Sequence, residues 1–446
     1  MQNVKVIART VEVESKTLGE EIKNGIAFSK DARLFAGKCA GVCYGSETYL
    51  DKGIHNKEAA TKRSEDVRKS GHYSCFEHMS CSLEIQTNKM IAMFLNSLLD
   101  YDTSEKSARY TMMNPETELE KTTYEKWISK FESVIKEKHG DIFDDKEIHK
   151  LAMENARYLI SVFTPTYMIY TISYKQANTI CTLIDSFVHE ELPRYIEDNF
   201  EEDEVNRKFV DDLESGLLQL KAELMTKLSL LDTDGTILLK NNKNIKQRFF
   251  AMDFDKETHI ADAYTVVYSS SLACLAQSHR HRTLRYSLNI DDLLFKRSAE
   301  ELGSNLEDYV YIPEIIQDRE DLVNEYAADA VMLITSGVTI QGTKVTICEQ
   351  GIVEDFILKC SERLCGRAQL ETMKRTVATL RLFKANRRCL SKSNRESIDL
   401  LFDKKGNPVP RCMFKNNKEK TAIQFVCSNP KSRCKFGAKN ALTRDI

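Results

Sequence analysis

Two polar stretches of the sequence hold side chains suited to binding an anionic ligand. The stretch QSHRHRTLRYSLN, residues 277–289, contains two histidines and three arginines. The stretch TSEKSARY, residues 103–110, spaces Glu105, Ser107 and Arg109 at alternate positions. Arginine offers phosphate a planar fork of donors, serine adds a further donor, and glutamate accepts from a sugar hydroxyl or a base N–H. A surface turn remains the alternative for the second stretch.

The first of these stretches could also serve in three different roles. A nucleic-acid surface would suit its arginines, but the net charge of −3 argues against a dedicated duplex binder. A metal site would need His279 and His281 to share one ion, yet residues two apart oppose each other on a strand and Arg280 repels a cation. A solvated basic helix end is the third possible role.

A third polar stretch, GHYSCFEH at residues 71–78, brings two histidines and a glutamate close together. A His–Glu pair alone is a weak motif. The alternative is the start of a helix or a turn, with Glu77 and His78 in solvent. Its value as a signal therefore depends on the motifs that surround it.

The elements expected around these stretches are short strands and long helices. The N-terminus and residues 80–86, 263–271 and 343–347 have the pattern of strands. Helical spacing is found in residues 119–139, 147–163, 177–200 and 200–231. The order of strand, helix and polar stretch occurs twice, which indicates an internal duplication. We expect an α+β fold of two tandem modules, each a small, mainly antiparallel sheet packed with long helices.

A polar segment at residues 232–244 marks the expected module boundary. It gives a first module at residues 1–232, a second at 245–388 and a cysteine-rich tail at 389–446. No apolar run reaches the roughly 18 residues that span a bilayer, and the N-terminus lacks the pattern of a signal peptide. We therefore expect a cytoplasmic protein with reduced cysteines and no membrane contact.

Taken together, the motifs of the first half resemble the flavin-dependent thymidylate synthase family. That family carries G-H-x-S-x-x-E-H, then Arg-His-Arg, then E-x-S-x-R-Y, and residues 76–110 fit this pattern without a gap. There is one departure, because the Arg-His-Arg triplet is replaced by Ser97, Leu98 and Leu99.

The missing triplet stands in the second half, as Arg280, His281 and Arg282. Gln277 and Tyr286 fall on the family's pyrimidine-contacting glutamine and its aromatic position. The E-x-S-x-R loop is absent here, and its positions hold Leu288, Ile290 and Asp292. The first half thus lacks the Arg-His-Arg triplet that the second half has, and the second half lacks the E-x-S-x-R loop that the first half has.

A third match lies near the end of the second module, where ERLCGRAQLET resembles the family's R-x-x-x-x-A-Q-W-E string. Arg363 takes the place of the arginine that contacts uracil, and Cys365 and Arg367 follow a variant of one family branch. Leu370 stands where the family has tryptophan. Another nucleotide-binding arginine of the family has no clear counterpart.

The resemblance implies conversion of dUMP to dTMP, with methylenetetrahydrofolate as carbon donor and FAD, reduced by NADPH, as hydride donor. Arg363 is the implied catalytic residue, which stabilises charge developing on the uracil ring. The implied substrate-binding residues are Gln277, Glu105, Ser107, Arg109 and Arg363. The implied cofactor-binding residues are His78, Arg280, His281, Arg282 and Arg367.

The family builds its sites where the subunits of a tetramer meet. A composite site could therefore take its triplet from the second module and its E-x-S-x-R loop from the first. The expected assembly is a homodimer that forms a pseudo-tetramer. Two alternatives remain open: a related flavin and folate enzyme that modifies C5 of another uracil nucleotide, for example by hydroxymethylation, and a degenerate, non-catalytic nucleotide- or flavin-binding homologue.

The C-terminal stretch is rich in cysteine and poor in core-forming pattern. Such a segment folds more easily around a Zn(Cys)4 site. The candidate ligands are Cys365, Cys412, Cys427 and Cys434. Unligated thiols are the alternative, because the spacings are not of the tight C-x-x-C type.

Overall fold

The structure is a computed structural model of the 446-residue chain. It describes residues 2–9, 32–44, 54, 56–98, 100–199, 204–231, 235–239, 249, 263–279, 284–294, 299–414, 436 and 440–446. The chain divides into two compact units. Unit 1 comprises Met1–Lys106, Pro165–Glu197 and Val210–Phe249, and unit 2 comprises Ser107–Thr164, Asp198–Phe209 and Phe250–Ile446.

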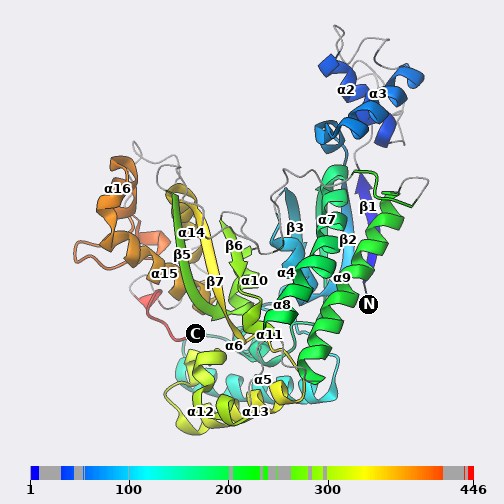
Figure 1. The fold of residues 1–446 in the computed structure, drawn as a ribbon. Coiled ribbons are helices and arrows are strands. Elements are labelled where there is room, and N and C mark those ends of the chain that lie inside the picture. Colours follow the sequence, from blue (N-terminus) through cyan, green and yellow to red (C-terminus); the bar gives the residue numbers. More distant parts are fainter. Residues whose placement is uncertain are drawn as a thin grey trace. The chain divides into compact units, whose positions relative to one another are not determined.

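Unit 1 is built on a four-stranded antiparallel sheet with the order β1-β2-β4-β3 (Figure 1). Its strands are β1 (Asn3–Arg9), β2 (Ser80–Asn88), β3 (Tyr101–Glu105) and β4 (Pro165–Ser173). On the paired strands β2 and β4, Cys81 faces Ile172 and Leu83 faces Tyr170, and all four side chains are buried. This apolar row is the half-buried face that the alternating pattern of β2 predicts.

The helices of unit 1 include two that contact the sheet, α4 and α7. The elements are α2 (Ala32–Tyr44), α3 (Lys57–Ser70), η1 (Tyr73–Glu77), α4 (Lys89–Asn96), α7 (Tyr174–Ser186), η3 (Phe187–Glu191) and α8 (Leu192–Asn199). Helix α9 (Glu204–Leu228) and the end of α8 contribute residues to unit 2, so both helices have residues in both units. Helices α2 and α3 approach closely at Gly37, where a Cβ atom would lie 1.9 Å from the backbone oxygen of Ala60. Only glycine allows that approach.

Unit 2 carries a three-stranded antiparallel sheet with the order β5-β7-β6. Its strands are β5 (Ala263–Ser271), β6 (Arg285–Leu288) and β7 (Lys344–Ile352). Its helical elements are α5 (Glu118–His139), α6 (Asp145–Ala156), η2 (Arg157–Leu159), α10 (Leu272–His279), α11 (Asp291–Leu294), α12 (Ala299–Tyr309), η4 (Glu314–Ile316), α13 (Glu320–Thr335), α14 (Val353–Arg363), α15 (Leu370–Ala385), η5 (Arg387–Cys389), α16 (Lys392–Asp399) and η6 (Arg411–Met413).

The large apolar core of unit 2 joins α5 and α6 to α12 and α13. Trp127 of α5 is fully buried and packs edge-on against Tyr326 of α13, with ring centroids 4.9 Å apart. The indole N–H of Trp127 donates to Asp329 over 2.7 Å, which satisfies its polar atom inside the core. Segments that are far apart in the sequence therefore share one core.

Three strands of the first sheet, in the order β2-β4-β3, are arranged like the second sheet, whose order is β5-β7-β6. In each, a strand leads into an eight-residue helix, α4 or α10, and then into a second strand. In each, the last strand in sequence, β4 or β7, lies between two other strands and is followed by a helix, α7 or α14. Glu105 ends β3 and Leu288 ends β6, so these two residues are equivalent in the two sheets.

The predicted fold class is confirmed: the chain is α+β, with small antiparallel sheets in two separate regions. The strand expected at residues 263–271 is β5, and the helix expected at residues 119–139 is α5. The helix expected at residues 147–163 ends at Ala156 and continues as the short turn η2. Strand β4 was not predicted.

The module boundary at residues 232–244 stays a prediction, because most of that segment lies outside the described residues. Residues 107–164, which belong to the first predicted module, pack in unit 2. Within the described part of the chain, no helix has both the length and the apolar character to cross a membrane.

Candidate functional site

Arg109 of the E-x-S-x-R loop is buried in unit 2 and holds two partners there. Its Nε lies 2.9 Å from a carboxylate oxygen of Glu154, on α6. Its Nη2 donates to the backbone oxygen of Arg367 over 2.8 Å, across 258 residues of sequence. Burial disfavours the guanidinium charge, but the adjacent Glu154 carboxylate, together with Tyr110 and Tyr158, raises the pKa of Arg109.

The R-A-Q loop after α14 is held from two sides. Arg109 binds the backbone oxygen of Arg367, and Arg444 donates to the backbone oxygen of Ala368 over 2.6 Å. Arg444 is itself buried, near the C-terminal end of the sequence. Two guanidinium groups from distant parts of the chain thus fix consecutive carbonyls, while the side chain of Arg367 remains exposed.

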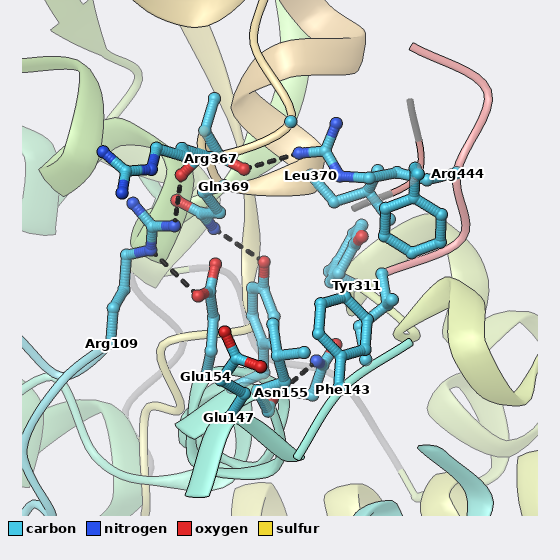
Figure 2. A pocket seen from close by; sticks show the side chains of 16 residues that line it. Arg109, Phe143, Glu147, Glu154, Asn155, Tyr311, Arg367, Gln369, Leu370 and Arg444 are labelled. Atoms are coloured by element: carbon cyan, nitrogen blue, oxygen red, sulfur yellow. Dashed lines mark hydrogen bonds and ion pairs between the residues drawn. The ribbon is translucent and has the colours of Figure 1, made fainter. Parts of the chain in front are cut away.

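A pocket opens beside this loop, between α6, the R-A-Q loop and the C-terminal segment (Figure 2). Figure 2 shows the side chains of Arg109 and Arg367 at the same end of it. The residues around it combine arginines and carboxylates with aromatic rings such as those of Phe143 and Tyr311. Its volume of about 30 Å³ has room for only a few water molecules. A nucleotide therefore does not fit the pocket as it stands.

A buried network of hydrogen bonds also supports the R-A-Q loop. Gln369 donates to the hydroxyl of Tyr158 over 2.7 Å, and Tyr158 donates to Glu371 over 3.2 Å. Glu371 also accepts from Ser270 at 2.7 Å and from the backbone N–H of Ser271 at 2.8 Å. The glutamate of the R-A-Q-x-E string is thus a structural anchor of the loop against β5.

Arg363 and Gln277, the two residues expected to contact the pyrimidine, lie next to each other. Arg363 is the last residue of α14, it is buried, and its Nη2 donates to the backbone oxygen of Gln277 over 3.3 Å. Gln277 is half-buried on α10. The structure brings these two together in unit 2, as it does Arg109 and the loop that carries Arg367.

His279 follows on α10 and is only 4% exposed, with its ring edge-on to Tyr286 at 5.6 Å. Burial lowers the pKa of His279 to about 4, so the imidazole is neutral at pH 7. This residue of the basic stretch is therefore part of the core rather than a solvated cation.

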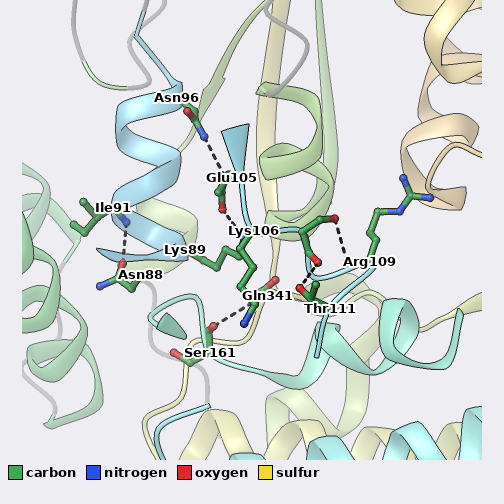
Figure 3. Close-up of polar contacts among 11 residues, drawn as sticks. Asn88, Lys89, Ile91, Asn96, Glu105, Lys106, Arg109, Thr111, Ser161 and Gln341 are labelled. Atoms are coloured by element: carbon green, nitrogen blue, oxygen red, sulfur yellow. Dashed lines mark hydrogen bonds and ion pairs between the residues drawn. The ribbon is translucent and has the colours of Figure 1, made fainter. Parts of the chain in front are cut away.

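Glu105 lies in unit 1, where its carboxylate has ion-pair and hydrogen-bond partners within the protein. It forms an ion pair with Lys89, and it accepts from the amide of Asn96 over 3.3 Å. Lys89 also donates to the backbone oxygen of Lys106 over 2.7 Å (Figure 3). The Glu105 side chain is 5% exposed, so its carboxylate serves a buried pair rather than an open surface.

The remaining residues of the first-half motifs are more accessible. Ser107 is half-buried in unit 2, where its hydroxyl accepts from the backbone N–H of Arg109 over 3.3 Å. In unit 1, His78 is exposed after the turn η1, and the neighbouring Glu77 pairs with Lys175 of α7. His78 and Ser107 belong to different units.

Five predicted site residues lie outside the described residues: Arg280, His281, Arg282, Cys427 and Cys434. Of the other two candidate zinc ligands, Cys365 is half-buried and Cys412 is exposed. Their segments run side by side, because the N–H of Arg411 donates to the backbone oxygen of Leu364 over 2.6 Å. Among the described residues no cluster of three metal-binding side chains occurs, so the zinc site stays a prediction.

Three residues of the site were missed from the sequence: Glu154, Tyr158 and Arg444. Nothing in their local pattern separates them from the other polar residues of α6, η2 and the C-terminal segment. Lys89 was also missed, although it left a signal. It is the single charged residue of the helix KMIAMFLN, whose side chains are all buried. A lone charge in such a helix needs a buried partner.

Comparison with known proteins supports the motif analysis for the first half of the chain. Residues 26–202 match the model of the family described as thymidylate synthase complementing protein, which confirms the predicted resemblance over that range. No curated protein matches the chain.

Solved structures similar to this chain include two of thymidylate synthases. A flavin-dependent thymidylate synthase from Helicobacter pylori, complexed with FAD and dUMP, is 15% identical over 49% of this chain and 93% of its own, with a TM-score of 0.27. A second structure from that organism, also with FAD and dUMP, is 15% identical over 51% and 99%, with a TM-score of 0.26. The UMP/dUMP methylase PolB from Streptomyces cacaoi, bound with 5-Br dUMP, is 14% identical over 51% and 95%, with a TM-score of 0.25.

Proposed function

We propose, from the family match of residues 26–202, that the protein is a flavin-dependent thymidylate synthase acting on dUMP in the cytoplasm. The observation that carries the proposal is the bond from Arg109 to the backbone oxygen of Arg367. It joins the E-x-S-x-R loop of the first half to the R-A-Q loop of the second. If the two halves of the chain had lost their functions independently, this contact between their motif loops would not be expected to persist.

The strand order β2-β4-β3 of unit 1, which matches β5-β7-β6 of unit 2, supports the proposed duplication. After duplication, one set of sites can keep the phosphate-binding loop of the first module and the Arg-His-Arg triplet of the second. We propose that two copies of the chain complete such sites in a homodimer, since the pocket beside Arg109 has no room for a nucleotide. A native mass measurement that finds a monomer would contradict this.

The proposed roles follow from side-chain chemistry. Ser107 and Arg109 would bind the phosphate of dUMP as hydroxyl and charge-assisted donors. Arg363, buried beside Gln277, would hold the uracil ring and stabilise negative charge on its oxygen, since a cation is most effective where water is excluded.

FAD, reduced by NADPH, would supply the hydride, and methylenetetrahydrofolate the carbon. Of the proposed cofactor-binding residues, His78 and Arg367 are described, and both are exposed. Each of them can therefore contact a cofactor that enters from solvent. Arg280, His281 and Arg282 complete the proposed cofactor set.

The first test is flavin absorbance of the purified protein, followed by tritium release from C5-labelled dUMP with and without folate. We expect bound flavin and folate-dependent release. Arg363→Ala should abolish release, and Arg363→Lys should restore part of it because the charge returns. Arg381→Ala, at an exposed arginine of α15, is the matched control and should keep the full rate. A normal rate for Arg363→Ala would refute the role of that residue.

One observation favours a second candidate, a homologue that binds flavin or nucleotide without turnover. The carboxylate of Glu105 is paired with Lys89, and the guanidinium of Arg109 with Glu154, as expected of residues kept for stability. Flavin binding without tritium release would support this candidate. Folate-dependent release that yields a product other than dTMP would instead indicate another C5 modification such as hydroxymethylation.

A further inference from the structure

A second, larger pocket lies in unit 2 near its C-terminal end, and none of its lining residues belongs to the proposed dUMP site. It is formed by the end of α15, the turn η5 and the first turn of α16, and its volume is about 640 Å³. Small-molecule sites commonly have volumes of roughly 300–1,000 Å³. Five of its seven lining residues are cationic: Lys384, Arg387, Arg388, Lys392 and Arg395.

The positive charge of this pocket is only partly neutralised. Asp399 pairs with Lys384 at 2.7 Å and with Arg387. Among the described residues, no carboxylate forms an ion pair with Arg388, Lys392 or Arg395. The lining carboxylate Glu396 and the bridging Asp399 therefore leave an excess of three positive charges. Like charges gathered in one concavity repel each other, and a bound anion would relieve that repulsion.

Two further features point to an anion. The Nε–H of Arg387 is shielded from solvent but has no acceptor among the described residues, and a buried donor without a partner is costly. Lys392 is the first residue of α16, and Ser391 caps that helix by accepting from the N–H of Asn394 over 3.3 Å. The N-terminal turn of α16, which carries the positive end of the helix dipole, thus contributes lining residues to the pocket.

We propose that this pocket binds a small polyanion carrying two or three linked phosphates. Among the described residues no aromatic side chain lines it, so they offer no stacking platform for a base, which single-stranded nucleic-acid sites use. Its basic side chains converge on one concavity instead of following an extended groove. Recognition therefore depends on the phosphates, and it is independent of the dUMP site proposed above.

The test is calorimetric titration of the full-length protein, without a polyhistidine tag, in phosphate-free buffer. The ligands are inorganic phosphate, pyrophosphate, tripolyphosphate and a nucleoside triphosphate. We expect affinity to rise with the number of linked phosphates and to fall at higher salt. Equal affinity of tripolyphosphate and the nucleoside triphosphate indicates an inorganic ligand. Tighter binding of the nucleoside triphosphate indicates a nucleotide, with its phosphates in the same pocket.

The double variant Arg388→Gln/Arg395→Gln should weaken tripolyphosphate binding by about ten-fold or more, since charge-assisted hydrogen bonds are lost. Lys404→Gln/Lys405→Gln removes the same charge from exposed lysines outside the pocket and should retain the wild-type affinity. Both variants should keep the wild-type melting temperature.

Three results would overturn the proposal. The first is unchanged tripolyphosphate binding in the Arg388→Gln/Arg395→Gln variant. The second is a single-stranded oligonucleotide that binds ten-fold more tightly through the same arginines. The third is displacement of tripolyphosphate by saturating dUMP, which would place the anion in the proposed active site.

Discussion

Replacement of His279 by phenylalanine should remove a specific part of the acid sensitivity of unit 2. The imidazole is buried against Tyr286, and burial lowers its pKa from 6.5 to about 4. The unfolded chain therefore binds a proton that the folded chain excludes. For a group with a depressed pKa, stability is fully present above pH 6.5 and is lost progressively as the pH falls toward 4.

The size of the effect follows from the two pKa values. At pH 5 the unfolded imidazole is almost fully protonated, whereas the folded one is about nine-tenths neutral. Proton linkage then lowers the free energy of unfolding by about 2 kcal/mol between pH 7 and pH 5. His279→Phe keeps a ring of similar size beside Tyr286 but cannot bind a proton. Its loss of stability over this interval should be smaller than that of the wild type by about this amount.

Urea unfolding monitored by tryptophan fluorescence is a suitable assay, because the chain has a single tryptophan. That residue, Trp127, lies in the core of unit 2, the unit that contains His279. The fluorescence therefore reports the unfolding of unit 2 even if unit 1 unfolds separately. His149→Gln, at an exposed histidine of α6 in the same unit, controls for the removal of an imidazole from the surface. If wild type and His279→Phe lose the same stability between pH 7 and pH 5, the burial argument is wrong.

Three further substitutions test the packing. Lys359→Met should destabilise unit 2 by roughly 3–5 kcal/mol, because it leaves the buried carboxylate of Glu349 without its ammonium partner 2.5 Å away. Tryptophan-detected urea unfolding measures this loss. The double variant with Glu349→Gln should recover part of it. Gly37→Ala should cost unit 1 roughly 1–3 kcal/mol through the clash with the Ala60 carbonyl, seen as a lower calorimetric melting temperature. Asp144→Ala removes the capping box of α6 and should cost about 1 kcal/mol in the tryptophan-detected assay.

The local elements were predictable where a periodic pattern was strong. The run AYTVVYSSS became β5 with the expected bounds, since β-branched and aromatic residues suit a pleated surface. The run PTYMIYTIS has the same character and forms β4, a strand that begins with proline and that was not predicted. Proline is acceptable there because it opens the strand.

The partners within the site were not predictable in the same way. The motifs identified Arg109, Gln277 and Arg363 as candidates, and the structure places Gln277 beside Arg363. The carboxylate that pairs with Arg109, however, comes from α6, and the guanidinium that holds Ala368 comes from Arg444. Such long-range pairs depend on the tertiary packing of α6 and the C-terminal segment, which no local periodicity encodes.

The way in which segments contribute to the two units also determines the order in which they can fold during synthesis. The sheet of unit 1 has all four strands once β4 has been made. Helices α5 and α6 are made before β4, yet the helices that cover Trp127 and its neighbours, α12 and α13, follow more than a hundred residues later. The nascent chain must therefore carry an exposed apolar face for much of its synthesis, as non-local contacts require. A fragment that stops at residue 232 would keep that face uncovered, and we expect it to aggregate or to recruit chaperones.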